Sequence, residues 1–341
     1  MQDLGQNLEQ DLGQRIGIVV IGRNEGDRLK TCLRSVLGWG LVVYVDSGST
    51  DNSLEFAESL GVVIVRLDLA RPFTAARARN AGFAKLLELQ PQTKYVQFVD
   101  GDCEIIADWF TKAYQFLEDH ETIAVVCGRR RERYPERSIY NQLCDLEWDT
   151  PVGRTKACGG DALMRVSAFQ AVGGFKDQLI AGEEPELCVR LRQQQWQIWR
   201  LEAEMTWHDA QMFQWQQWWK RHVRAGFAFA EGAWLHGQPP EKHWVKESRS
   251  IWLWALLIPG VSLGASLLTN GLSLSLLLGY PVLAYKMARS FQRQGLSAPL
   301  ARIYASACLL AKFPQMMGQL RFHWLRLTKQ KATIVEYKTA P

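Results

Sequence analysis

The sequence lacks the cysteine, glycine and charge patterns that mark several common classes of protein. Its seven cysteines form no Cys-x-x-Cys pair and no metal-type spacing, which predicts reduced, mostly buried thiols of a cytosolic compartment. It has no Gly-x-Gly-x-x-Gly after the first predicted strand and no Gly-x-x-x-x-Gly-Lys-Ser/Thr, which argues against a dinucleotide site or a P-loop. The net charge of +5 is modest and dispersed, so nucleic acid is not an expected partner.

The N-terminus lacks the apolar core of a signal peptide or a membrane span, and we expect residues 1–15 to form a mobile arm. At 341 residues the chain can hold one large domain or two ordinary ones.

Apolar runs of strand length alternate with helix-type spacing through the first hundred residues. The predicted strands cover 16–21, 41–45, 62–67 and 95–99, and the predicted helices cover 27–37, 52–60 and 73–89. Continuous apolar runs are typical of parallel strands buried on both faces. The pattern predicts an α/β fold with a mostly parallel, doubly wound sheet.

The fourth predicted strand ends in Asp100-Gly-Asp102. In open α/β sheets the ligand crevice lies beyond the carboxyl ends of the strands, so both carboxylates would face a substrate. Two hard oxygen ligands at this spacing suit Mg2+ or Mn2+, which takes further ligands from water and a diphosphate. For this motif taken alone, a simple Asp-Gly turn is the alternative.

Several motifs together resemble the family 2 glycosyltransferases in order and spacing, over roughly residues 16–235. They are Ile18-Val-Val-Ile-Gly-Arg-Asn-Glu25, Val45-Asp-Ser-Gly-Ser-Thr-Asp51, Ala78-Arg-Asn-Ala-Gly82, Phe98-Val-Asp-Gly-Asp102, Gly159-Gly-Asp-Ala-Leu-Met-Arg165, Val172-Gly-Gly-Phe175 and Gly182-Glu-Glu-Pro-Glu-Leu-Cys-Val-Arg-Leu191. The resemblance implies a GT-A fold, a nucleotide-sugar donor, a divalent metal and inversion at the anomeric carbon.

The resemblance assigns donor binding to residues that match its motifs: Asn24, Glu25, Asp46, Arg79, Asp100 and Asp102. Asp46 matches the acid that holds the nucleotide base, with a helix cap as its alternative. A plain turn is the alternative for Asn24. Arg79 would lie beside the diphosphate, Asp100 would contact the ribose, and Asp102 would bind the metal.

The resemblance assigns the acceptor site and the general base to the second half of the motif set. Glu184 matches the position of the base that deprotonates the acceptor hydroxyl, and Glu183 is the second choice. Adjacent acids at a helix start can instead simply complement the helix dipole. Gly159, Gly160 and Asp161 match the segment beneath the acceptor, where small residues let a sugar approach the backbone.

His208 follows a short predicted strand at 197–201. A lone histidine is more often structural than a ligand, but family 2 chains commonly place one near the metal and the diphosphate. Both interpretations stay open, and the metal ligands expected from the resemblance are Asp102 and His208.

The sequence after the catalytic motifs changes character. Aromatic residues mixed with Lys220, Arg221 and Arg224 predict a helix in 211–250 that suits a membrane interface, although a core helix or a dimer surface fits equally. Residues 251–269 and 272–285 contain no charge and flank a tight turn, which predicts a transmembrane hairpin over 251–289. Residues 290–341 would form an interfacial helix, within 299–320, and a basic tail. A helical pair in a separate soluble domain is the alternative for the hairpin.

The sequence thus predicts a membrane-anchored, inverting hexosyltransferase with a GT-A catalytic domain over residues 16–210 on the cytoplasmic side of the inner membrane. It would transfer a sugar from a nucleoside-diphosphate sugar, with a UDP-sugar favoured, to a lipid-linked glycan, as in exopolysaccharide or cell-surface glycan synthesis. Polyprenyl phosphate is the alternative acceptor. A non-catalytic, sugar-binding membrane scaffold is the alternative of another class, and a homo-oligomer is compatible with the sequence.

Overall fold

The computed structural model describes residues 13–330 and residue 332. The arm predicted for residues 1–15 lies almost entirely outside the described residues, as does most of the predicted basic tail. The described chain forms two compact units that divide between Phe213 and Gln214. The first unit contains a large sheet and the second is helical.

The first unit is built on one mixed sheet. Its strands are β1 (Ile16–Gly22), β2 (Leu41–Asp46), β3 (Val63–Arg66), β4 (Tyr95–Asp100), β5 (Cys103–Ile105), β6 (Ile123–Glu132), β7 (Gly153–Thr155), β8 (Ala162–Arg165) and β9 (Gln197–His208). Their order is β3-β2-β1-β4-β8-β6-β9-β5, and β7 pairs with β9. The four strands predicted from apolar runs are confirmed as β1 to β4, of which β1, β2 and β4 are almost wholly buried.

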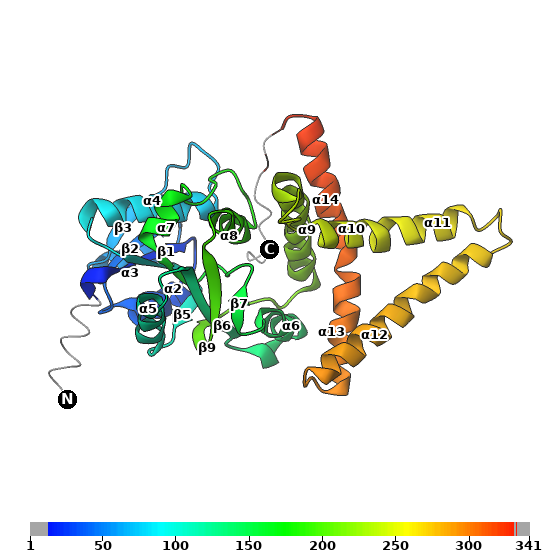
Figure 1. Cartoon of the computed structure of the whole chain (residues 1–341), viewed down its shortest axis with the longest axis horizontal. Coiled ribbons are helices and arrows are strands. Elements are labelled where there is room, and N and C mark those ends of the chain that lie inside the picture. The colour runs from blue at the N-terminus through cyan, green and yellow to red at the C-terminus, as the bar shows by residue number, and fades with distance from the viewer. Residues whose placement is uncertain (1–12, 331, 333–341) are drawn as a thin grey trace. The chain divides into compact units, whose positions relative to one another are not determined.

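Helices lie on both sides of this sheet (Figure 1). They are α2 (Asp27–Val36), α3 (Ser53–Ser59), α4 (Ala75–Leu89), α5 (Trp109–Asp119), α6 (Ile139–Trp148), α7 (Val166–Ala171) and α8 (Glu183–Gln193), with a 3-10 turn η1 (Pro135–Arg137) before α6. Helix α2 shows why they form, because Leu29, Leu33 and Val36 recur at helical spacing and are buried together. The predicted helices at 27–37, 52–60 and 73–89 are thereby confirmed.

The prediction of a mostly parallel sheet holds for β3, β2, β1 and β4, whereas the rest of the sheet is mixed. Strand β8 pairs antiparallel with β4 and β6, and β9 pairs antiparallel with β5 and β7, while β6 and β9 pair in parallel. Strand β9 runs to His208, well beyond the predicted 197–201. The prediction ended too early because exposed Glu202 and Glu204 interrupt the apolar pattern of the strand.

The second unit contains α9 (Trp215–His236), α10 (Val245–Trp252), α11 (Ile258–Gly264), α12 (Gly279–Arg293), α13 (Ala298–Leu310) and α14 (Lys312–Leu327), with a π-helical segment η2 (Leu253–Leu257) and a 3-10 segment η3 (Leu272–Leu278). The predicted apolar segment 299–320 is thus divided between α13 and α14. Helices α9 and α14 approach closely at glycines. A Cβ on Gly318 would lie 2.0 Å from the backbone oxygen of Val223, and one on Gly226 would lie 1.9 Å from that of Gln315.

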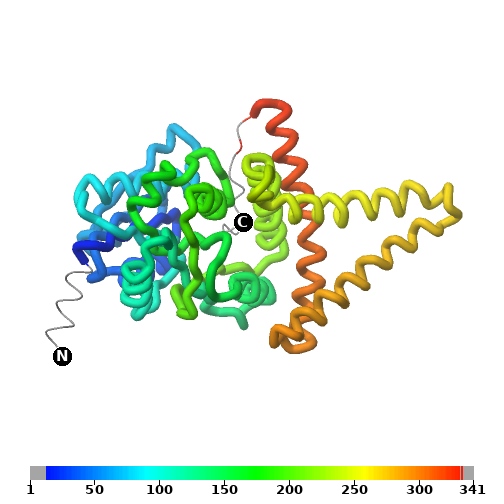
Figure 2. The backbone as a smooth tube through the Cα atoms, in the orientation of Figure 1, coloured from blue at the N-terminus to red at the C-terminus, as the bar shows by residue number. Residues whose placement is uncertain are grey.

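The predicted hairpin turns where expected, at Asn270 and Gly271, whose φ angles are 50° and 85°. Figure 2 shows its two arms meeting at this turn. The helical part of the first arm passes from α10 through η2 into α11 and ends at Gly264, before the end of the uncharged segment at residue 269. Pro259 offers no N–H to the preceding turn, which favours the wider π-helical spacing before it.

Among residues 13–330, none of the helices combines the length and the apolar character needed to cross a membrane.

The close contact of α9 with α14 predicts that Gly318→Ala destabilises the second unit. Its new Cβ would meet the backbone atoms Val223 O and Phe227 N at 2.0 and 2.6 Å, so a helix must shift, at a cost of about 1–3 kcal/mol. Gly260→Ala is the matched control, because nothing lies within 4 Å of that Cβ and alanine favours the helix. Urea unfolding in detergent measures both; equal stability of the two variants would contradict this packing.

Candidate active site

The carboxyl ends of three parallel strands place the predicted donor residues along one edge of the sheet. Asp46 at the end of β2 pairs with Gly22 of β1, and Asp100 at the end of β4 pairs with Ile21 of β1. Ligands bind at this edge in open α/β sheets. The structure thus brings the motifs of β1, β2 and β4 together as expected.

Asp46 is buried and holds the turn that follows β2. Its Oδ2 accepts hydrogen bonds from the backbone N–H groups of Gly48 at 2.9 Å and Ser49 at 3.0 Å, and its Oδ1 accepts one from the Tyr44 hydroxyl at 3.2 Å. The carboxylate therefore holds this turn, but it does not cap helix α3, whose N-cap residue is Asn52. A contact of Asp46 with the nucleotide base stays a prediction.

The loop after β1 is tied to the same turn. The side-chain oxygen of Asn24 accepts a hydrogen bond from the Thr50 N–H at 2.7 Å, and the N–H of Asn24 donates to Ser49 Oγ at 3.0 Å. Glu25 forms an ion pair with Arg28 at 2.7 Å. These contacts hold the two loops at the sheet edge in one arrangement, and their contact with a nucleotide stays a prediction.

Arg79 joins Asp100 at the end of β4 to the two acids at the start of α8. Its Nη2 lies 2.6 Å from Asp100 Oδ1, while its Nη1 lies 2.9 Å from Glu183 Oε1 and 3.0 Å from Glu184 Oε1. The side chain of Arg79 is 2% exposed, so this guanidinium is a buried charge that needs these partners. Through it, groups more than one hundred residues apart in sequence form a single cluster.

The segment at 159–161 lies directly against this cluster. A Cβ on Gly160 would fall 2.6 Å from Asp100 Oδ2 and 2.7 Å from Arg79 Nη2, so glycine is required there. Asp161 is fully buried; its Oδ1 accepts a hydrogen bond from the Asp100 N–H at 3.0 Å. Asp161 therefore orients Asp100 from beneath the site, whereas Gly159 is exposed. A contact of these residues with an acceptor stays a prediction.

The two acids at the start of α8 differ in accessibility. The side chain of Glu183 is 4% exposed and that of Glu184 is 15% exposed, so Glu184 is the acid that a substrate can reach. Burial and the neighbouring charge of Glu183 raise the pKa of Glu184 to about 7, against the lowering effect of Arg79. One guanidinium faces three carboxylates in this cluster, which favours a proton on one of them.

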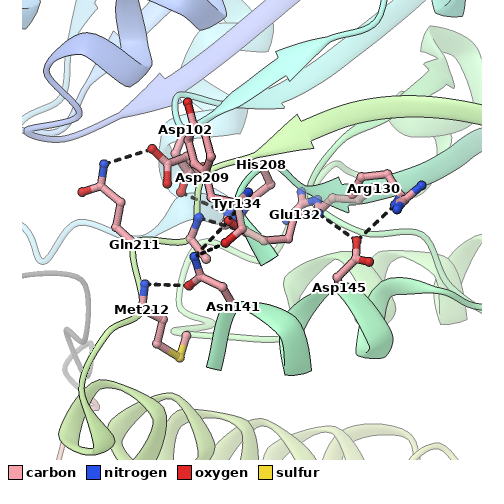
Figure 3. Close-up of polar contacts among 12 residues, drawn as sticks. Asp102, Arg130, Glu132, Tyr134, Asn141, Asp145, His208, Asp209, Gln211 and Met212 are labelled. Atoms are coloured by element: carbon pink, nitrogen blue, oxygen red, sulfur yellow. Dashed lines mark hydrogen bonds and ion pairs between the residues drawn. The ribbon is translucent and has the colours of Figure 1, made fainter. Parts of the chain in front are cut away.

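The pairing of β5 with β9 brings the two predicted metal ligands together. Cys103 of β5 lies opposite His208 of β9, and His208 Nε2 lies 3.1 Å from Asp102 Oδ2 (Figure 3). A carboxylate oxygen and an imidazole nitrogen that converge in a buried position suit Mg2+ or Mn2+. The thiol of Cys103 lies in the same cluster, but burial raises its pKa well above the usual value, so it stays protonated.

The site also contains three residues that were not predicted from the sequence: Arg130, Glu132 and Trp148. Arg130 of β6 lies 3.3 Å from Asp100 and 2.7 Å from Asp161, and it also stacks over the ring of Trp148. Glu132 of β6 lies beside His208. The apolar run at 123–127, followed after Gly128 by a run of charged residues, is a signal of a buried strand that ends at the site.

The mixed sheet of the first unit has the GT-A fold. Residues 17–172 match the model of the glycosyl transferase family 2, so this part of the chain is a family 2 glycosyltransferase domain.

Two similar proteins extend this comparison. The succinoglycan biosynthesis protein ExoA of Rhizobium meliloti (strain 1021) is 26% identical over 170 residues, which cover 46% of this chain and 50% of that protein. The chain therefore spans about half the length of this curated relative. The mannosyltransferase PcManGT from Pyrobaculum calidifontis, solved with GDP-Man and Mn2+, has a TM-score of 0.59 at 18% identity, with 91% of this chain and 87% of that chain covered. At that identity the likeness shows the fold.

The crowded carboxylates predict that Glu184→Gln stabilises the protein at alkaline pH. Because the folded-state pKa of Glu184 is raised from 4.5 to about 7, the wild-type protein loses stability as pH rises through this interval. The free energy of unfolding of the variant, relative to that of wild type, should therefore rise by about 2–3 kcal/mol between pH 5 and pH 8. Urea unfolding at both pH values measures this gain, with exposed Glu55→Gln as control. A gain that does not change with pH would contradict the raised pKa.

Proposed function

We propose that this protein is an inverting, metal-dependent glycosyltransferase that uses a nucleoside-diphosphate sugar and an acceptor held at a membrane. The observation that carries the proposal is the cluster around Arg79, which unites Asp100 with Glu183 and Glu184. It places an acid suited to deprotonate an acceptor next to the edge where a donor would bind.

Asp102 and His208 would hold the divalent cation. When bound, the cation supplies positive charge that stabilises the departing diphosphate. The fit rests on the 3.1 Å approach of Asp102 Oδ2 to His208 Nε2 and on the surplus of carboxylates over guanidinium groups nearby. Arg79 would add a fixed positive charge from the protein itself.

Glu184 would act as the general base. Its carboxylate takes the proton of the acceptor hydroxyl while that oxygen forms a bond to the anomeric carbon. The bond between the anomeric carbon and the diphosphate oxygen breaks, and the nucleoside diphosphate leaves with the electron pair. A single displacement of this kind inverts the anomeric configuration. Buried Glu183 would keep Arg79 in place.

The two similar proteins support the choice of substrates. PcManGT was solved with a GDP-sugar and Mn2+, and ExoA is named for the biosynthesis of a polysaccharide. A sugar nucleotide as donor and a growing glycan as acceptor follow as proposals for this chain. The sequence favoured a UDP-sugar, so the test includes both UDP- and GDP-sugars.

The second unit supports a membrane-held acceptor through its exposed leucines. Between Leu253 and Val282, twelve large hydrophobic side chains are exposed, and Leu267 and Leu268 at the tip of the hairpin are 92% and 88% exposed. No charged residue occurs between Arg249 and Lys286. An apolar surface of this extent is typical of a membrane or protein contact. We propose that the hairpin is buried in lipid, with both charged flanks on the cytoplasmic side.

The catalytic proposal predicts different effects for two variants of the full chain in detergent. One sugar nucleotide among UDP-, GDP- and dTDP-sugars should bind with Mn2+, and Asp102→Ala should lose this binding. Glu184→Gln should keep donor binding and lose turnover by about 10²–10⁴-fold, because general-base catalysis contributes about this factor. Wild-type turnover should rise with pH through about 7, as deprotonation of Glu184 requires.

Calorimetry measures donor binding, release of nucleoside diphosphate measures turnover, and NMR of the product gives its anomeric configuration. Glu55→Gln serves as the control for loss of an exposed carboxylate. If none of the sugar nucleotides binds in the presence of metal, the chain is a scaffold rather than an enzyme. Retained configuration in the product would exclude the single displacement.

The membrane proposal predicts that the purified protein floats with vesicles of phosphatidylethanolamine and phosphatidylglycerol. The double variant Leu267→Asp/Leu268→Asp should lose most of this binding, because it places two charges at the tip of the hairpin. The double variant Leu69→Asp/Val152→Asp introduces the same charges at exposed positions of the first unit and should float like wild type. If the protein instead forms a stable dimer and does not float with vesicles, the exposed leucines belong to a protein interface.

A further inference from the structure

We infer that Glu132 is a positioning residue that fixes the imidazole of His208 so that Nε2 faces the metal. This inference rests on the metal dependence proposed above. Glu132 is the last residue of β6 and lies opposite His208 in the parallel pairing of β6 with β9. The imidazole therefore lies between two carboxylates, with Nε2 3.1 Å from Asp102 Oδ2 and Nδ1 3.5 Å from Glu132 Oε2.

The surroundings of Glu132 are unusual for a buried carboxylate. Glu132 is 1% exposed, and in the described part of the chain no lysine or arginine forms an ion pair with it. Neutral donors surround it instead: the Ala210 N–H lies 3.1 Å from Oε2, and the Tyr134 N–H and Asn141 Nδ2 lie 3.3 and 3.2 Å from Oε1 (Figure 3). A carboxylate buried at this cost without a lysine or arginine needs a further reason to be there.

The histidine supplies that reason. A neutral imidazole carries its proton on one nitrogen and a lone pair on the other, and the group beside one nitrogen selects the tautomer. The carboxylate of Glu132 accepts a hydrogen bond from Nδ1–H, which leaves the lone pair of Nε2 directed toward Asp102. A carboxylate behind a metal-bound histidine acts in this way in many metal sites. The ring of Trp148, whose centroid lies 4.7 Å from that of His208, limits rotation of the imidazole.

Asn141 makes the carboxylate irreplaceable by an amide. Its Nδ2 donates to Glu132 Oε1 and to the Tyr134 carbonyl, while its Oδ1 accepts the Met212 N–H at 3.0 Å. Asn141 cannot turn its amide over without losing these bonds. A glutamine at 132 has only one side-chain oxygen, so its NH2 group would face either the donors that now bind Oε1 or those that now bind Oε2. It therefore could not accept hydrogen bonds from both sets of donors.

The test compares Mn2+ binding by Glu132→Gln and by wild type, in the full chain without donor. Calorimetry and the EPR signal of free Mn2+ measure the affinity. We expect Glu132→Gln to bind Mn2+ roughly 10–100-fold more weakly, the usual effect of losing such a partner. Glu204→Gln is the matched control, because it removes the same charge from β9 at a 41% exposed side chain that pairs with Arg131. It should bind like wild type.

Equal affinity of Glu132→Gln and wild type would overturn the inference and leave the proposed function intact. If wild type itself binds no Mn2+, the metal dependence fails instead, and the inference fails with it. A second measurement needs no variant of Glu132 and decides the case if Glu132→Gln does not fold. In the Mg2+-loaded wild type, 15N NMR of His208, assigned with His208→Gln, should show the proton on Nδ1. A proton on Nε2 would overturn the inference.

Discussion

The buried guanidinium of Arg79 is the interaction on which the site depends. A charge with 2% exposure is stable only beside partners of opposite sign, and here three carboxylates from two distant motifs supply them. The same contacts fix Asp100 and the start of α8 relative to each other. The need to neutralise one buried charge therefore assembles the site, and the excess of carboxylates leaves it ready for a cation and for a shared proton.

The rest of the sheet edge shows how the protein prepares this site in advance. Asp46 and Asn24 use their oxygens to hold the two loops after β1 and β2, and Asp161 holds the backbone of Asp100 from below. Polar groups fixed in this way need little rearrangement when charge develops on a substrate, which is the main source of electrostatic catalysis. In the same way, Glu132 would hold His208 through an arrangement of neutral donors.

The second unit contains two contrasting kinds of apolar helix. Helices α9 and α14 approach at Gly226 and Gly318, where the backbones nearly touch and no side chain fits. The hairpin instead leaves large hydrophobic side chains exposed, Leu267 and Leu268 most of all. The first arrangement gains its stability from packing within the chain. The hairpin arms also contact each other, through the rings of Trp254 and Tyr280 for example, but their exposed leucines are left for the surrounding apolar phase that we propose.

The sequence by itself determined the strands β1 to β4, the loops after them and the acids that end them. Buried parallel strands leave continuous apolar runs, and Asp46 and Asp100 interrupt these runs visibly. Tertiary structure alone decided the second half of the sheet. Exposed glutamates interrupt the apolar residues of strand β9, so its sequence does not show a clear strand pattern. Its pairing with β5 and β6 brings His208 beside Asp102 and Glu132, which lie about one hundred and about eighty residues away in the sequence. Local pattern cannot reveal such contacts, because they depend on which strands pair and in which register.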